Sequence, residues 1–187
     1  MEILAVSLAV LYLALAVKQN ILCWLAAILS AVLYFFVMYS AGLYMEACLQ
    51  IFYIVMGFYG WSQWQSNESK FIIRSWSNVN HFKAISLILL LALSSGFLLE
   101  TFTDAALPFF DALTTWGAVV ATYMVAKKLI ENWIYWFVID FISVFLFLSR
   151  DLHLTALLFL GYLVMICFGY RAWNKTRLNI KKKASAK

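Results

Sequence analysis

The chain has 187 residues and a net charge of +5, and 65% of its residues are apolar while 12% are charged. A soluble globular domain carries about twice that share of charged residues, and a disordered chain lacks so much apolar sequence. The composition therefore predicts one membrane domain, and a single Pro and seven Gly exclude collagen-like and low-complexity chains.

The apolar segments predict an all-α membrane protein with seven transmembrane helices, because a bilayer core needs about 20 apolar residues per helix. The first segment is expected to be a retained helix and not a secretory signal, since its leading charge is Glu2 and its basic residue, Lys18, follows the apolar run. In chain order, the expected spans cover residues 3–17, 21–39, 44–61, 84–99, 109–126, 132–149 and 153–172.

The basic residues predict how these spans are oriented. Seven of the 14 Lys and Arg residues lie between Arg171 and Lys187. With the N-terminus outside, 13 of the 14 fall on the inner side, and the exception is Arg150. Because short cytoplasmic segments are enriched in Lys and Arg, we expect an N-out, C-in topology. The basic tail then needs no nucleic acid partner.

The two ends of the sequence resemble each other after a shift of 112 residues. Two triplets of helices separated by a single helix have the same orientation, so the shift predicts a 3+1+3 parallel repeat, which is a transporter architecture. The expected divisions are a first repeat (1–64), a linker with the fourth helix (65–108), a second repeat (109–173) and a basic tail (174–187). The shift pairs Asn20 with Asn132, Trp24 with Trp136, Gly57 with Gly169, and Trp61 with Trp173.

Asp140 is the leading candidate for a functional residue. It lies halfway through the sixth expected span, where a carboxylate costs about 2.5–3.5 kcal/mol on insertion scales. Trp133, Trp136 and Ser143 share its helical face, and indole rings beside a carboxylate suit a flat organic cation. The tryptophans fit an interfacial aromatic belt as well. The 112-residue shift places Ile28 opposite Asp140, which predicts an asymmetric site.

The third expected span offers a second polar face. Gln50 and Tyr53 are placed to hydrogen-bond a ligand, and Glu46, near the outer end, fits either a ligand contact or a solvated carboxylate. Asn132 opens the sixth span. The sequence has no metal-ligand cluster, Ser-His-Asp set or phosphate-binding loop, so neither a metal, a cofactor nor enzymatic activity is expected.

The stretch Trp133-x-x-Trp136-x-x-x-Asp140 resembles the W-x-x-W-x-x-x-N/D motif of the PnuC vitamin transporters, the bacterial nicotinamide riboside carriers and their relatives. The segments Pro108-Phe109-Phe110-Asp111 and Tyr59-Gly60-Trp61-x-x-Trp64 are also similar to that family. The resemblance covers nearly the whole chain. It implies a fold similar to full-length SWEET transporters, located in the bacterial inner membrane.

The resemblance also implies facilitated diffusion of an unphosphorylated vitamin, which a cytoplasmic kinase then traps. Trp133 and Trp136 are expected to stack on the ligand and Asp140 to meet its charge, while Gln50, Tyr53 and Asn132 supply hydrogen bonds. Nicotinamide riboside carriers typically end the motif with Asn, so Asp favours thiamine first and nicotinamide riboside as the alternative. A receptor or assembly subunit that passes nothing across is the rival, and a homo-oligomer is left open.

Overall fold

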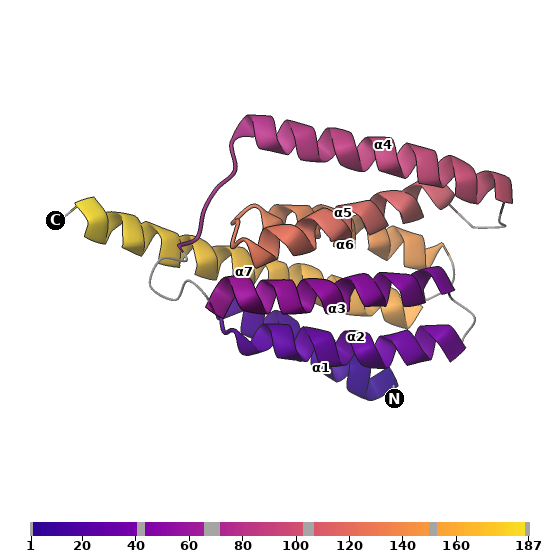
Figure 1. Ribbon diagram of the computed structural model, residues 1–187, viewed down its shortest axis with the longest axis horizontal. Helices are drawn as coiled ribbons and strands as arrows, with labels where there is room; N and C mark the ends of the chain where they lie inside the picture. Colours follow the sequence, from indigo (N-terminus) through magenta and orange to yellow (C-terminus); the bar gives the residue numbers. More distant parts are fainter. Residues whose placement is uncertain (1, 41–43, 66–71, 103–106, 150–152, 186–187) are drawn as a thin grey trace.

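The computed structural model describes residues 2–40, 44–65, 72–102, 107–149 and 153–185, and these residues form an all-helical bundle (Figure 1). Each of the seven expected spans corresponds to a helix, which confirms the helical class and the number of helices in the described residues. The helices are α1 (Glu2–Val17), α2 (Leu22–Ser40), α3 (Tyr44–Gln65), α4 (Asn78–Phe102), α5 (Pro108–Ala126), α6 (Asn132–Leu148) and α7 (His153–Ser185).

The last helix is longer than the sequence indicated. α7 continues to Ser185, so the residues expected to form a separate basic tail extend the helix instead. The reason is local: the segment after 172 contains neither Pro nor Gly, and most of its residues are good helix formers. α4 likewise begins at Asn78, before the expected start at 84.

Length and apolar character single out three of the described segments as able to cross a membrane: Asn78–Phe102, Pro108–Ala126 and Ala156–Ile180. Three other apolar helical segments are shorter, at Ile3–Val17, Leu22–Val37 and Asn132–Leu146. Each of the six lies within one of the seven helices.

The helices pack as two groups of three with α4 at the edge. α2 packs against α1 and α3, and α6 packs against α5 and α7. The groups meet along two seams, one between α1 and α7 and the other between α3 and α5. In the described part of the chain α4 packs only on α5. Its buried stripe has the four-residue spacing of one helix face: Ala84, Ile88, Ala92 and Gly96.

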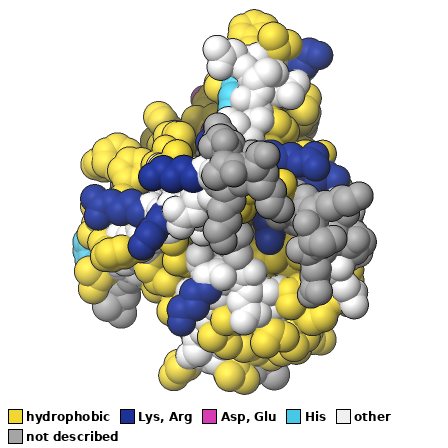
Figure 2. All heavy atoms as spheres, turned by 90° about the vertical axis from the view of Figure 1, so that its left-hand side faces the viewer, with side chains coloured by type: hydrophobic (Ala, Val, Ile, Leu, Met, Phe, Trp, Pro, Cys, Tyr) yellow, Lys and Arg dark blue, Asp and Glu magenta, His cyan; other side chains and the backbone are white. Residues whose placement is uncertain are grey.

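The up-and-down course of the helices brings the basic segments to one end of the molecule. The α1–α2 and α5–α6 connections, the segment before α4 and the end of α7 lie together on the left of Figure 1, and the N-terminus lies at the opposite end. Figure 2 shows Lys and Arg side chains gathered on that face. We call this face the basic end. The grouping of charges that the orientation argument requires is therefore present.

Local backbone features of α1–α3 recur 109 residues later. Gln19 and Lys128 both have positive φ, at 55° and 50°. Each follows a helix in the same way, because the Gln19 N–H donates to the Ala16 carbonyl and the Lys128 N–H to the Val125 carbonyl, both over 3.0 Å. The two connections therefore have matching geometry.

The packing of the tryptophans recurs with the same spacing. In each group an indole lies against a glycine of the third helix and makes an edge-on contact with a second indole, with centroid distances of 5.6 and 5.5 Å and an interplanar angle of 87° in both. The residues are Trp24, Gly60 and Trp64 in the first group, and Trp133, Gly169 and Trp173 in the second.

These contacts correct the register expected from the sequence. Trp24 corresponds to Trp133 and not to Trp136, so the packing follows a shift of 109 residues and not 112. The error has a simple origin, because Trp133 and Trp136 are three residues apart and lie near the same helical face. Trp61 and Trp64 have the same spacing. Matching residue types alone therefore fits both registers.

Gly169 offers a test of this packing. A Cβ atom there would lie 2.4 Å from the Trp133 ring, whereas at Gly161 it would meet nothing within 4 Å. We expect Gly169→Ala to lower the free energy of unfolding by about 1–3 kcal/mol through overpacking. Gly161→Ala, the control, is expected to be neutral or to gain up to about 1 kcal/mol. Thermal unfolding of both variants measures the difference, and equal stability would contradict the described contact.

Candidate functional site

Asp140 is buried at the middle of α6, where only 4% of its surface is exposed. Its carboxyl group is close enough to the phenols of Tyr53 on α3 and Tyr162 on α7 to interact electrostatically with both. The acid therefore faces the interior of the bundle. The outer face of α6 is apolar and exposed, and it carries Ile134, Phe137, Val138, Phe141 and Phe145.

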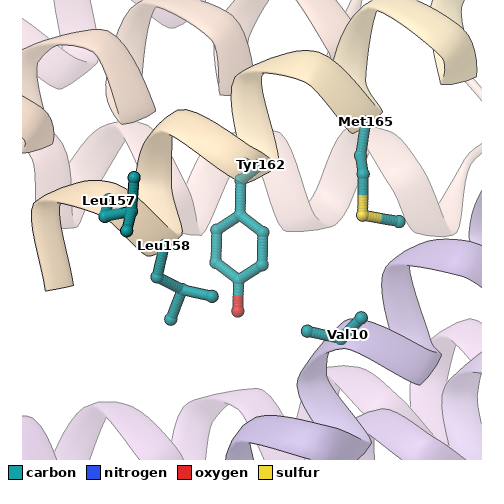
Figure 3. Close-up of a pocket in the computed structure, with 6 residues that line it drawn as sticks. Val10, Leu157, Leu158, Tyr162 and Met165 are labelled. Atoms are coloured by element: carbon teal, nitrogen blue, oxygen red, sulfur yellow. The ribbon is translucent and has the colours of Figure 1, made fainter. Parts of the chain in front are cut away.

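Tyr162 connects this polar cluster to a cavity at the seam between α1 and α7. The cavity has a volume of about 430 Å³ and lies between Val10 of α1 and one face of α7. Figure 3 shows the Tyr162 hydroxyl pointing from α7 into the space in front of Val10. Tyr162 also interacts electrostatically with Tyr34 of α2. Phenols from three helices thus lie near a single buried carboxylate.

The cluster is asymmetric although its surroundings recur. Tyr53 and Tyr162 are 109 residues apart and occupy equivalent places on α3 and α7. The position equivalent to Asp140 is Ala31, which is buried, and not Ile28 as the 112-residue shift indicated. Two equivalent phenols therefore lie near one acid that has no counterpart. Such an arrangement suits a single ligand with one charged group.

Three further predicted residues lie near this level of the bundle. Ser143 is buried one turn after Asp140 on α6. Gln50 is half-buried on α3, three residues before Tyr53. Trp136 is half-buried and packs against the cluster of buried indoles. The side chain of Glu46 lies outside the described residues.

Trp133 and Asn132 lie nearer the basic end, where α6 begins. Trp133 is 2% exposed, so the aromatic-belt interpretation is wrong for this residue. Asn132 is fully buried, and its Nδ2 donates to the Leu129 carbonyl over 2.5 Å. Because a helix rises 1.5 Å per residue, Trp133 begins about 10 Å along the axis from Asp140. The structure therefore does not bring these two residues beside the carboxylate.

Four indoles close the basic end of the bundle. Trp64 and Trp173 join the two groups of helices, with ring centroids 6.3 Å apart. The Trp173 Nε1–H donates to the Ala16 carbonyl over 2.9 Å, which ties α7 to α1. Among the described residues the buried ring N–H groups of Trp24, Trp64 and Trp133 have no hydrogen-bond partner. We call these four tryptophans the indole cluster.

The segment before α4 is fastened over the same end. The Arg74 N–H donates to the Lys128 carbonyl, and the Ile130 N–H donates to the Arg74 carbonyl, each over 3.0 Å. The Glu131 carboxylate accepts hydrogen bonds from the Ser75 hydroxyl and the Trp76 N–H.

Lys128 adds to this closure. Its ammonium lies 4.4 Å from the centre of the Trp64 ring, within the range of a cation–π contact. Burial lowers the pKa of Lys128 below its ordinary value. A basic side chain is therefore held against the indole cluster at the end of the bundle.

Tyr34 and Tyr162 are site residues that the sequence argument missed. Tyrosine is common in this chain, with 10 copies, so residue type alone does not distinguish them. The usable signal was the 109-residue spacing between Tyr53 and Tyr162, and it was hidden by the choice of the wrong register.

The comparison with known families decides the identity of the chain. Residues 1–175 match the family model described as nicotinamide mononucleotide transporter. The chain belongs to this family. The resemblance to the PnuC vitamin transporters is thereby confirmed, and the chain is a membrane transporter of the PnuC family.

Relatives within the family agree with this assignment. The nicotinamide riboside transporter PnuC of Escherichia coli (strain K12) is 22% identical over 187 residues, covering 85% of this chain and 78% of that protein. The riboflavin/roseoflavin transporter RibM of Streptomyces davaonensis is 24% identical over 174 residues, covering 89% and 80%. The crystal structure of the vitamin B3 transporter PnuC has a TM-score of 0.75 at 20% identity, covering 94% of this chain and 81% of that one. This chain therefore has the PnuC fold.

Proposed function

We propose that the protein carries nicotinamide riboside across the bacterial inner membrane by facilitated diffusion. The observation that carries the proposal is the buried Asp140 carboxylate, with the phenols of Tyr53 and Tyr162 near it and a cavity beside Tyr162. A buried acid is costly unless it has a partner, and the pyridinium ring of nicotinamide riboside is a cation of suitable size.

The relatives guide the choice among cationic vitamins. The E. coli relative is named for nicotinamide riboside, and the structural neighbour for vitamin B3. Thiamine, which the sequence favoured, is named by neither of them, nor by RibM. It stays a second candidate because an Asp occupies position 140, where a carboxylate suits both the charge and the amine of thiamine. Riboflavin, although a relative carries it, is neutral and gains little from an acid.

Each site residue has a proposed part in this function. Asp140 balances the charge of the ligand, and Trp136 stacks on its ring. Trp133 and Asn132, which the sequence placed at the ligand, are proposed instead to form the inner gate with the indole cluster. The proposed hydrogen-bonding residues are Gln50, Tyr53, Ser143 and Tyr162, with Glu46 at the outer entrance.

Transport is proposed to arise from movement of the two three-helix groups. They would form a 3+1+3 parallel repeat similar to SWEET transporters, and rock at the α1–α7 and α3–α5 seams with α4 as a tether. The proposed orientation is N-out and C-in, so the indole cluster closes the cytoplasmic side. A cytoplasmic kinase would then trap the vitamin by phosphorylation.

Isothermal titration calorimetry on the purified protein tests the substrate. We expect nicotinamide riboside to bind at least about tenfold more tightly than riboflavin, because the loss of one charge-assisted contact costs about 1.5–3 kcal/mol. Thiamine is expected to fall between the two. Tighter binding of riboflavin than of both cations would overturn the role given to Asp140, and thiamine as the tightest ligand would reverse the order of the two cations.

A further inference from the structure

A second cavity lies at the other seam of the bundle. Its volume is about 620 Å³, and its walls come from α3 and α5 with α4 and the segment before it along one side. It corresponds to the cavity beside Tyr162, because Val119 and Met56 here occupy places equivalent to Val10 and Met165 there, 109 residues apart. The two seams therefore have related hollows.

The second cavity differs from the first in its polar lining. Trp76, Asn80 and Lys83 contribute to it near the basic end, where α4 begins. The described lining of the first cavity has no basic residue and no tryptophan. α4 and the segment before it, which have no counterpart at the α1–α7 seam, supply these polar groups.

The cavity changes from polar to apolar along α4. Asn80 and Lys83 are exposed on its rim, and Leu87 lies one turn further along the helix. Met56 of α3 and Val120 of α5 continue the apolar part. A water-soluble anion would match only the first of these regions, whereas an amphiphile matches both.

Positive charge at the rim sets the sign of the ligand. No carboxylate of the described chain pairs with Lys83. The Lys127 ammonium lies 5.9 Å from the centre of the Tyr123 ring, which also lines the cavity. Basic pockets between transmembrane helices, placed at the level of the lipid headgroups, bind anionic phospholipids. Tryptophan, here Trp76, also favours that level.

We propose that this cavity binds an anionic phospholipid of the leaflet at the basic end. The headgroup phosphate would contact Lys83 and Asn80, and an acyl chain would lie against Leu87, Val120 and Met56. The site lies at the α3–α5 seam, on the other side of the bundle from the cavity beside Tyr162. The proposal does not depend on which vitamin the protein carries.

Native mass spectrometry of the purified full chain with phosphatidylglycerol tests this site, with phosphatidylcholine of the same acyl chains as the neutral comparison. We expect wild-type protein to retain phosphatidylglycerol preferentially. Lys83→Gln is expected to weaken its binding about fivefold, the effect of removing one basic residue near a lipid surface. Lys175→Gln, the control on exposed α7 at the same end, is expected to change it less than twofold.

Two further measurements examine the apolar half of the site. Val120→Phe, which reduces the cavity, is expected to weaken phosphatidylglycerol binding while leaving thermal unfolding near that of the wild type. Millimolar inorganic phosphate is expected not to displace the lipid. Equal retention of the two lipids, equal effects of Lys83→Gln and Lys175→Gln, or displacement by phosphate alone would each overturn the proposal.

Discussion

Replacing Asp140 with Leu is expected to weaken the binding of nicotinamide riboside by about 10- to 100-fold. The variant removes a buried carboxylate, and a hydrogen bond to a charged group contributes about 1.5–3 kcal/mol. Folding is not expected to suffer, because replacing a buried charge with an apolar residue of similar volume is often neutral or stabilising. Calorimetry gives the affinity, and thermal unfolding of the same sample verifies the fold.

Two companion variants make this result specific to the carboxylate. Asp140→Asn keeps the shape and an oxygen acceptor, so it should retain nicotinamide riboside better than Asp140→Leu and lower the affinity for thiamine more strongly. Glu100→Gln removes an exposed acid near the end of α4 and should leave both affinities unchanged. Wild-type affinity in Asp140→Leu would mean that the acid does not meet the ligand.

The two tryptophans of the α6 motif are expected to respond differently to truncation. Trp133→Ala should lower the free energy of unfolding by about 3–5 kcal/mol, as truncation of a buried Trp leaves a cavity, here beside Gly169 and Trp173. Trp136→Ala should lower ligand affinity by about 1–3 kcal/mol through lost stacking. Thermal unfolding and calorimetry on both variants separate the two effects.

Trp116 provides the control for this pair. It is half-buried on α5 and donates to the Ser95 hydroxyl of α4 over 3.0 Å, at the interface with α4. Trp116→Ala should therefore leave ligand affinity unchanged. If Trp136→Ala destabilises the protein as strongly as Trp133→Ala and leaves affinity intact, Trp136 is a packing residue and its proposed role is wrong.

Hydropathy and charge predicted the broad fold because each depends on short stretches of sequence. Seven apolar segments became seven helices, and the Lys and Arg clusters came together at one end of the described bundle. The end of α7 was misjudged for a related reason. Loss of apolar character after Ala172 marks a boundary of burial, but it does not stop a helix that lacks a breaking residue.

The details of packing were beyond the sequence argument. Asp140 was predicted to be functional because an acid in an apolar span is costly, and it is buried in the bundle. The separate place of Trp133 depends on Gly169 and Trp173 of α7, and the sequence spacing of Trp133 and Trp136 gives no sign of those contacts. Long-range contacts of this kind decide which of two similar residues packs and which remains accessible.

Uptake into proteoliposomes tests the central claim most directly. The protein is reconstituted without an ion gradient, and radiolabelled nicotinamide riboside is added outside. Facilitated diffusion through a passage at Asp140 predicts that the label enters unchanged until the internal and external concentrations are equal, and that entry is strongly slowed in Asp140→Leu. Binding without entry would identify a receptor, and equally fast entry in Asp140→Leu would contradict a passage at that residue.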